Sequence, residues 1–154
     1  MAGHVHTYAA TATWRGTTAA GYEAYSRDHE VVTPAGAPAI ALSGDAAFGG
    51  DGARTNPEQL IVAAASSCQL LSFLARAARA RIEVVAYEDE AVGEMPEDDQ
   101  PLRIVSILLR PRITVAAGTD LDRVRKLVMQ AHEDCYVASS LRTQIVIEPE
   151  LLEA

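Results

Sequence analysis

Residues 56–81, which read NPEQLIVAAASSCQLLSFLARAARAR, decide the fold of this chain. Asn56 is a good N-cap, and Pro57 suits the first position of a helix because that position needs no hydrogen-bonded N–H group. Apolar residues occupy nearly every face between Leu60 and Leu74, which predicts that the helix is buried on most of its sides. The sequence therefore predicts a buried central helix over residues 57–80.

Short strands are predicted on the N-terminal side of this helix. Weak alternation of residues, with glycines and prolines between the runs, indicates an antiparallel meander within residues 6–43. Its strands are expected at residues 6–15, 22–26, 29–33 and 39–43. The glycine-rich stretch 44–55 is predicted to be a mobile loop, which either covers a pocket or simply connects two elements.

Two strands, a helix and a last strand are predicted within residues 82–148. The strands are expected at residues 82–95, 102–115 and 144–148, the helix after a cap at Thr119 or Asp120, and a tail at 149–154. Pro111 cannot donate to a sheet, which favours an edge position or a bulge there. Cys135 is expected on the apolar stripe of the second helix, four residues after Ala131.

The element order lacks a regular βαβ alternation. It predicts an α+β fold class, with antiparallel sheets around a buried central helix, and a single domain over residues 1–154. The scarcity of aromatic residues, at 5%, makes a thin core and mildly favours oligomerisation.

The charge balance excludes some classes of partner. The 154 residues carry a formal net charge of −8, which argues against binding to nucleic acid or to anionic membranes. Residues 1–20 lack the apolar run of a secretory signal, and no uninterrupted run reaches the ~18 apolar residues of a membrane span. A cytoplasmic location is therefore expected, where thiols start reduced.

Cys68 and Cys135 are the only cysteines and lie far apart in the sequence. Two thiols that meet in a fold can form a reversible disulfide, so the pair indicates redox chemistry. Burial among apolar residues raises the pKa of a thiol, so reaction at neutral pH requires a nearby cation, and arginine is the abundant candidate. The alternative interpretation of Cys68 alone is an inert core cysteine.

The string NPEQLIVAAASSC resembles the motif of the OsmC/Ohr family of thiol peroxidases, in which NPEQL precedes a helical cysteine. Cys135, late in the chain, resembles the second cysteine of that family. The resemblance implies that Cys68 attacks the peroxide, that Cys135 resolves the product as a disulfide, and that Glu58 orients a catalytic arginine. It also implies an intertwined homodimer, an organic hydroperoxide substrate, no bound cofactor, and an external dithiol reductant, lipoyl-type in some members.

The resemblance also implies a catalytic arginine in the N-terminal sheet. Arg27 is the first choice, because this chain resembles the branch of the family that carries the string YSRDH, and Arg15 and Arg54 are reserves. Ten residues of unbroken helix rise about 15 Å, so Glu58 cannot reach Cys68 within one continuous helix. Either the helix breaks between them, or the relevant Glu58 comes from a second subunit, which is the favoured interpretation.

Several alternatives remain open from the sequence. The chain could be a non-enzymatic redox sensor, or a small-molecule binding module whose cysteines are idle. His132 stands beside two acidic residues, but without a second ligand pair no metal is expected. An apolar surround for an organic hydroperoxide is predicted from Leu70, Leu71, Phe73 and Tyr136.

Overall fold

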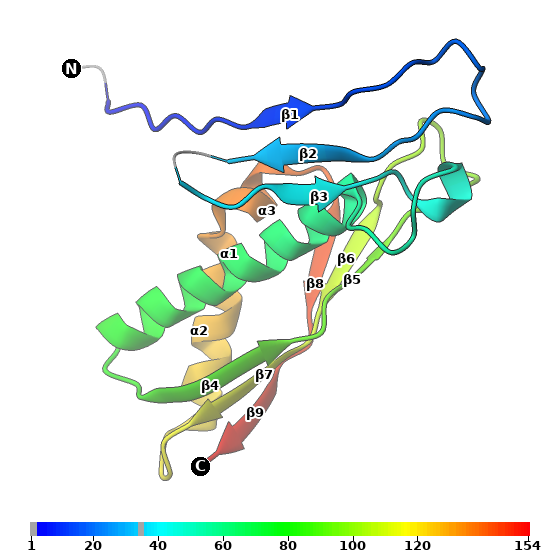
Figure 1. Ribbon diagram of the computed structural model, residues 1–154. Coiled ribbons are helices and arrows are strands. Elements are labelled where there is room, and N and C mark those ends of the chain that lie inside the picture. Colours follow the sequence, from blue (N-terminus) through cyan, green and yellow to red (C-terminus); the bar gives the residue numbers. More distant parts are fainter. Residues whose placement is uncertain (1–2, 34–35) are drawn as a thin grey trace. The chain divides into compact units, whose positions relative to one another are not determined.

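The computed structural model describes residues 3–33 and 36–154. The chain divides after Pro57 into two compact units, an N-terminal unit up to that residue and a C-terminal unit from Glu58 to Ala154. The single domain expected over the whole chain stays a prediction. Figure 1 shows the order of the elements along the chain.

The N-terminal unit contains one small antiparallel sheet. Strands β1 (Thr11–Thr13), β2 (His29–Val32) and β3 (Ile40–Leu42) pair in that order, as the meander predicts. The strand predicted at 22–26 is wrong, because turns closed by backbone hydrogen bonds around Gly21 take its place. The predicted link between residues 33 and 39 includes residues 34 and 35, which lie outside the described residues.

The glycine-rich stretch after β3 has defined local structure. A short 3₁₀ helix, η1 (Ala46–Phe48), follows Asp45, whose side chain accepts a hydrogen bond from the N–H group of Ala47 over 2.7 Å. A Cβ atom at Gly50 would lie 1.7 Å from the carbonyl oxygen of Gly44, so the backbone approach there requires glycine. The stretch is therefore a closely folded turn rather than an open connection.

The C-terminal unit is built on two three-stranded sheets. Its strands are β4 (Val84–Asp89), β5 (Val92–Glu94), β6 (Ser106–Leu109), β7 (Pro111–Val115), β8 (Gln144–Ile147) and β9 (Glu150–Glu153). They form the sheets β4-β7-β9 and β5-β6-β8, in which β6 pairs with β8, and β7 with β9, in parallel. The α+β class is confirmed, but the sheets are mixed rather than antiparallel. The chain passes through a helix between the parallel partners, which is the connection that parallel pairing requires.

The long strands expected from the sequence are each divided in two. The break before β7 lies at Arg110, whose N–H group donates to the Asp89 carboxylate over 2.7 Å. Pro111 is the first residue of β7, which is the middle strand of its sheet, so the predicted edge position is wrong. A proline is tolerated at the start of a strand because no ladder hydrogen bond is lost. The predicted tail is also wrong, since β9 occupies it.

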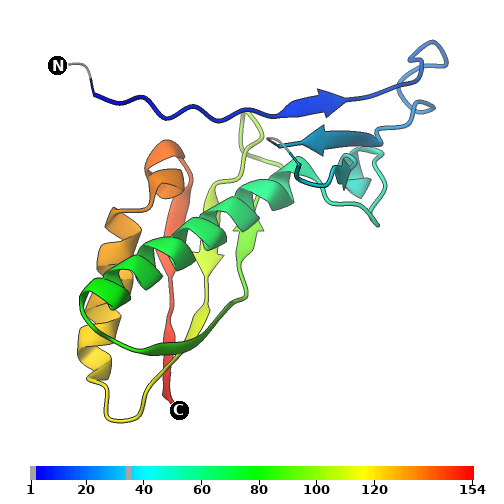
Figure 2. The same cartoon turned by 60° about the vertical axis from the view of Figure 1, so that its left-hand side comes forward.

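Three helices complete the C-terminal unit. They are α1 (Pro57–Arg79), whose first residue closes the N-terminal unit, α2 (Leu121–Glu133) and α3 (Tyr136–Ser140). The Asp120 side chain caps α2 by accepting from the N–H group of Arg123, which confirms one of the two predicted caps. Helices α1 and α2 lie against each other beside the strands (Figure 2) and join them in one core.

Burial of α1 follows one stripe rather than most of its surface. Its buried residues are spaced four apart: Ala65, Gln69, Phe73 and Ala77. On other faces Leu71 is 64% exposed and Leu74 is 38% exposed, so the predicted burial on most sides is wrong for the single chain. One chain supplies too little surface to cover a helix that is apolar all round.

The composition of α1 also meets a simple test for membrane spans. An 18-residue window within Pro57–Arg79 has a mean hydropathy of 1.5, and 22% of that window is buried. The core helix of a soluble protein meets the same test, so length and composition alone are weak grounds for a membrane span. Gln69 faces the core and donates to the Val128 carbonyl over 3.0 Å, which places a polar contact within this helix pair.

Candidate active site

Cys68 and Cys135 reach the site from two different elements of the C-terminal unit. Cys68 lies in the middle of α1 and is partly exposed. Cys135 is the N-cap of α3, is 1% exposed, and accepts a hydrogen bond from the Ala138 N–H group over 3.4 Å. The expected place of Cys135 on the α2 stripe is wrong, because α2 ends at Glu133 and the chain turns before α3 begins.

The two sulfurs lie within hydrogen-bonding reach of each other, and both cysteines are free thiols. The Cys135 thiol donates to the Cys68 sulfur. The backbone N–H groups of Tyr136 and Val137 also donate to this sulfur, and so does the Ser72 hydroxyl one turn along α1. The structure therefore brings together the two cysteines that the sequence singled out.

Hydrogen bonding at Cys68 outweighs its burial. Burial raises the pKa of the Cys68 thiol, but donors from Val137, Cys135, Tyr136 and Ser72 together lower this pKa below its ordinary value. Such donors favour the thiolate because they place positive charge density beside the sulfur. A thiolate is the nucleophilic form of cysteine, so these hydrogen bonds favour the nucleophilic form of Cys68.

Cys135 has the opposite tendency. Burial raises the pKa of the Cys135 thiol, the Ala138 N–H group lowers it, and the neighbouring Cys68 sulfur raises it again. The net effect is a raised pKa, so the surroundings of Cys135 favour its protonated form. A cysteine that favours its thiolate, beside a second thiol, is an arrangement that can be oxidised stepwise to a disulfide.

Sequence reasoning missed the donors at Cys68. It expected a cation to offset burial, whereas the causes that lower the pKa of Cys68 are hydrogen bonds. Ser72 could have been found, because a hydroxyl four residues along a helix lies on the same face as the cysteine. The N–H groups of Tyr136 and Val137 could not, because backbone donors leave no trace in the amino-acid sequence.

The arginine candidates all belong to the N-terminal unit. Arg27 donates to the carbonyls of Tyr25 over 3.1 Å and Tyr22 over 2.9 Å, and its guanidinium lies 4.4 Å and 4.7 Å from the centres of their rings. Asp28, which the sequence places beside Arg27, pairs instead with Arg54 over 3.3 Å. Because Cys68 belongs to the other unit, the choice of Arg27 over Arg15 and Arg54 stays a prediction.

Glu58 lies far from Cys68 of its own chain. Helix α1 is continuous from Pro57 to Arg79, so the ten residues between the two side chains separate them by about 15 Å along the helix axis. The alternative in which the helix breaks between them is therefore wrong. What remains of the prediction is a Glu58 supplied by a second subunit.

The predicted apolar surround is only partly available. Leu71 is 64% exposed and Tyr136 is 83% exposed, so both can contact a substrate, and Leu70 is half-buried. Phe73 is fully buried in the core, so its predicted place in the surround is wrong. The reason is the period of helix α1, which places Phe73 on the buried stripe of this helix, facing the core.

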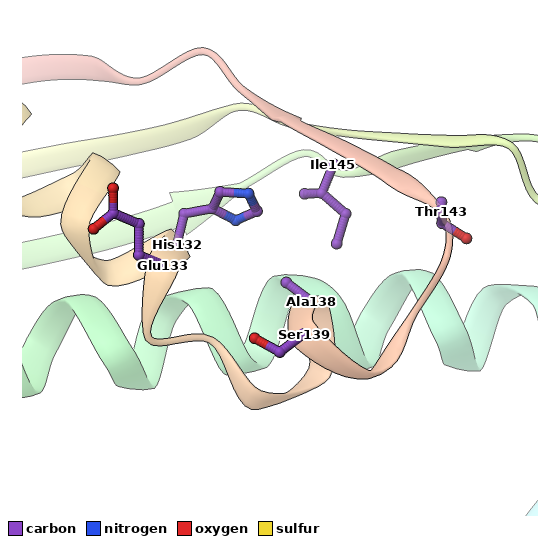
Figure 3. A pocket seen from close by; sticks show the side chains of 6 residues that line it. All are labelled: His132, Glu133, Ala138, Ser139, Thr143 and Ile145. Carbon is purple, nitrogen blue, oxygen red and sulfur yellow. The ribbon is translucent and has the colours of Figure 1, made fainter.

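A separate pocket of about 290 Å³ lies behind the turn that carries Cys135. Figure 3 shows the His132 ring directed toward Ile145, with Glu133 pointing away from it. The remaining lining residues are Ala138, Ser139 and Thr143, so neither sulfur opens into this pocket. Among the described residues no three His, Cys, Asp or Glu side chains gather closely enough to hold a metal ion.

A family model described as OsmC-like protein matches residues 49–150, which is more than half of the chain and includes both cysteines. The chain belongs to the OsmC-like protein family. A search of curated proteins found no significant match.

Solved structures share this OsmC-like fold along nearly the whole chain. An OsmC-like protein of unknown function from Vibrio cholerae is 29% identical, with a TM-score of 0.85, and the match covers 94% of this chain and 99% of that one. An organic hydroperoxide resistance protein from Legionella pneumophila is 19% identical, with a TM-score of 0.68 and coverage of 97% and 98%. Another, from Bacillus subtilis, is 23% identical, with a TM-score of 0.61 and coverage of 95% and 98%. The last two matches show the fold alone.

Proposed function

We propose that this protein is a thiol peroxidase that reduces organic hydroperoxides, with Cys68 as the nucleophile and Cys135 as the resolving cysteine. Membership of the OsmC-like family supports the general role, because organic hydroperoxide resistance proteins share its fold. The observation that carries the proposal is the neighbouring pair of thiols, in which the pKa of Cys68 is lowered and that of Cys135 is raised.

The first step consumes the peroxide. The Cys68 thiolate attacks one oxygen of the O–O bond, that bond breaks, and the alkoxide leaves and takes up a proton as the alcohol. Cys68 becomes a sulfenic acid. The sulfur loses two electrons and the peroxide gains them.

The second step forms the disulfide. The Cys135 sulfur attacks the sulfenic sulfur, an S–S bond forms, and the hydroxyl group leaves with the proton of Cys135 as water. An external dithiol then reduces the disulfide by exchange and becomes oxidised itself. A lipoyl-type dithiol is the proposed reductant, and the cytoplasm is the proposed location.

Arg27 and Glu58 have proposed supporting roles. An arginine beside the reacting oxygens stabilises both the thiolate and the developing charge, and it cannot act as a base. Because Glu58 is about 15 Å along α1 from Cys68, the Glu58 that orients Arg27 comes from the other subunit of a homodimer. The exposed apolar residues of α1, among them Leu71 and Leu74, support a second copy as the cover of that face.

Thiol counting tests the proposal. Free thiols are titrated before and after one equivalent of cumene hydroperoxide, and the count is expected to fall from two to none. In a Cys135→Ser variant the single remaining thiol, Cys68, is expected to be oxidised to a sulfenic acid. Dimedone then forms an adduct at Cys68, because this sulfenic acid has no resolving partner. If the wild-type count stays at two, the peroxidase proposal fails.

Turnover separates an enzyme from a redox sensor. With dihydrolipoamide in excess, an enzyme consumes many equivalents of hydroperoxide, and Cys68→Ser abolishes that consumption. A disulfide that forms once and is not turned over by any dithiol would instead indicate the sensor. Unchanged consumption in Cys68→Ser would contradict both functions.

A further inference from the structure

Arg76 connects α1 to the turn that carries Cys135. Its Nε donates to the Asp134 carboxylate over 2.5 Å, and its Nη1 donates to the side-chain carbonyl of Gln130 over 3.2 Å. Asp134 is the residue directly before Cys135 and is the C-cap of α2. The guanidinium therefore holds both the last turn of α2 and the entry to α3.

The turn between α2 and α3 has few hydrogen bonds of its own. The Asp134 N–H group donates to Gln130 over 3.3 Å and the Cys135 N–H group donates to His132 over 3.2 Å, both at the long end for such bonds. The position of Cys135 relative to α1 therefore depends on contacts that cross between the elements.

Oxidation of Cys68 weakens one set of these contacts. The hydrogen bonds that Cys135, Tyr136 and Val137 donate to the Cys68 sulfur favour a thiolate acceptor. They weaken when that sulfur becomes a sulfenic acid. The contacts of Arg76 with Asp134 and Gln130 do not involve the sulfur, so they persist through the first step and are present when the disulfide must form.

We propose that Arg76 is a positioning residue for disulfide closure, which keeps Cys135 within reach of the oxidised Cys68 through its contacts with Asp134 and Gln130. This inference rests on the proposed peroxidase function. It assigns Arg76 to the second chemical step alone, because Arg76 lies two turns beyond Cys68 along α1 and contacts the resolving side. Closure needs the two Cα atoms within about 7 Å, so loosening the turn lowers the fraction of molecules that can react.

The expected size of the effect is modest. The side chains of Arg76 and Asp134 are 28% and 49% exposed, so salt and water weaken their interaction. Arg76→Gln is expected to slow closure about threefold to fivefold, in line with ion pairs of this exposure. The rate of the first step is expected to stay within about twofold of the wild type.

Arg79→Gln is the matched control. Arg79 lies one turn further along α1, and its charge helps to lower the pKa of the Asp134 carboxyl. The variant removes the same charge from the same helix without removing the contact at the turn. Closure in Arg79→Gln is expected to remain within about twofold of the wild type.

Formation of the Cys68–Cys135 disulfide is followed after one equivalent of cumene hydroperoxide is added. Samples are stopped at intervals with a fast alkylating reagent, and the mass of the protein is measured by mass spectrometry. The sulfenic acid and the disulfide differ in mass, so the two rate constants are obtained separately. Asp134→Asn is expected to slow closure as much as Arg76→Gln, and the double variant is expected to be no slower than either. Raising the salt concentration is expected to slow wild-type closure toward the Arg76→Gln rate and to leave that variant unchanged.

Three results would overturn the role of Arg76: unchanged closure in Arg76→Gln, equal slowing in Arg79→Gln, or a parallel loss in the first step. Independent, multiplying effects in the double variant would overturn it as well.

A second experiment uses diamide, an azo oxidant that adds to the first thiolate, after which the second thiol displaces the hydrazine and forms the disulfide. If the wild type ignores hydroperoxide but closes with diamide, the peroxidase proposal fails, and the same comparison of variants with diamide still decides the role of Arg76.

Discussion

Replacing Gln69 by methionine tests how an incompletely paired amide affects the fold beside Cys68. Gln69 is 1% exposed, and its Nε2 donates to the Val128 carbonyl over 3.0 Å. Its Oε1 is buried and has no hydrogen-bond partner among the described residues. The variant loses one hydrogen bond, a cost of about 1 kcal/mol, and removes an unsatisfied acceptor that costs about 1–3 kcal/mol. Gln69→Met is therefore expected to raise the free energy of unfolding by about 0–2 kcal/mol.

Urea unfolding of the reduced protein measures this difference, with midpoints compared at a shared m value. Gln69→Ala is the comparison variant, and it is expected to destabilise the fold because it leaves a cavity between α1 and α2. A loss of more than about 1 kcal/mol in Gln69→Met would show that Oε1 is paired in solution, and the reasoning from an orphaned acceptor would be refuted.

Ser72→Ala removes a hydrogen-bond donor that lowers the pKa of Cys68, so the alkylation of Cys68 by iodoacetamide is expected to need a higher pH. An unchanged pH profile of alkylation would contradict the contact between Ser72 and Cys68. Leu151 packs on the core from β9, so Leu151→Ala is expected to cost about 1–2 kcal/mol in urea unfolding, and more than Leu152→Ala, whose side chain is 38% exposed. Leu74→Glu places a charge on the exposed face of α1, and sedimentation velocity is expected to show loss of the dimer, whereas a dimer of unchanged strength would exclude this face from the interface.

The sequence predicts the central helix well, because its signals are local. The N-cap and proline at its start, and the arginines at its end, place it at 57–80 against Pro57–Arg79 in the structure. The contact between Cys68 and Cys135 is also as expected. The spacing of the two cysteines alone does not predict this contact, whereas the resemblance to a family does.

What the sequence could not predict depends on contacts between distant segments. The residues of β9 look like a tail because their pattern is short, and pairing with β7 is what orders them. Cys135 keeps an apparent helical period with Ala131, yet Asp134 ends α2 and the chain turns before the cysteine. The burial of α1 was overestimated because an apolar sequence does not say whether the same chain or another copy covers each face.

The most direct test of the proposed thiol roles is the alkylation of each cysteine as a function of pH, followed by mass spectrometry of the separate peptides. The pH midpoint reports the pKa of each thiol, and it does not depend on the accessibility that limits the absolute rate. Cys68 is expected to react with a midpoint below the ordinary pKa of cysteine, and Cys135 with a midpoint above it. Coincident midpoints, or a lower midpoint for Cys135, would contradict the assignment of nucleophile and resolving cysteine.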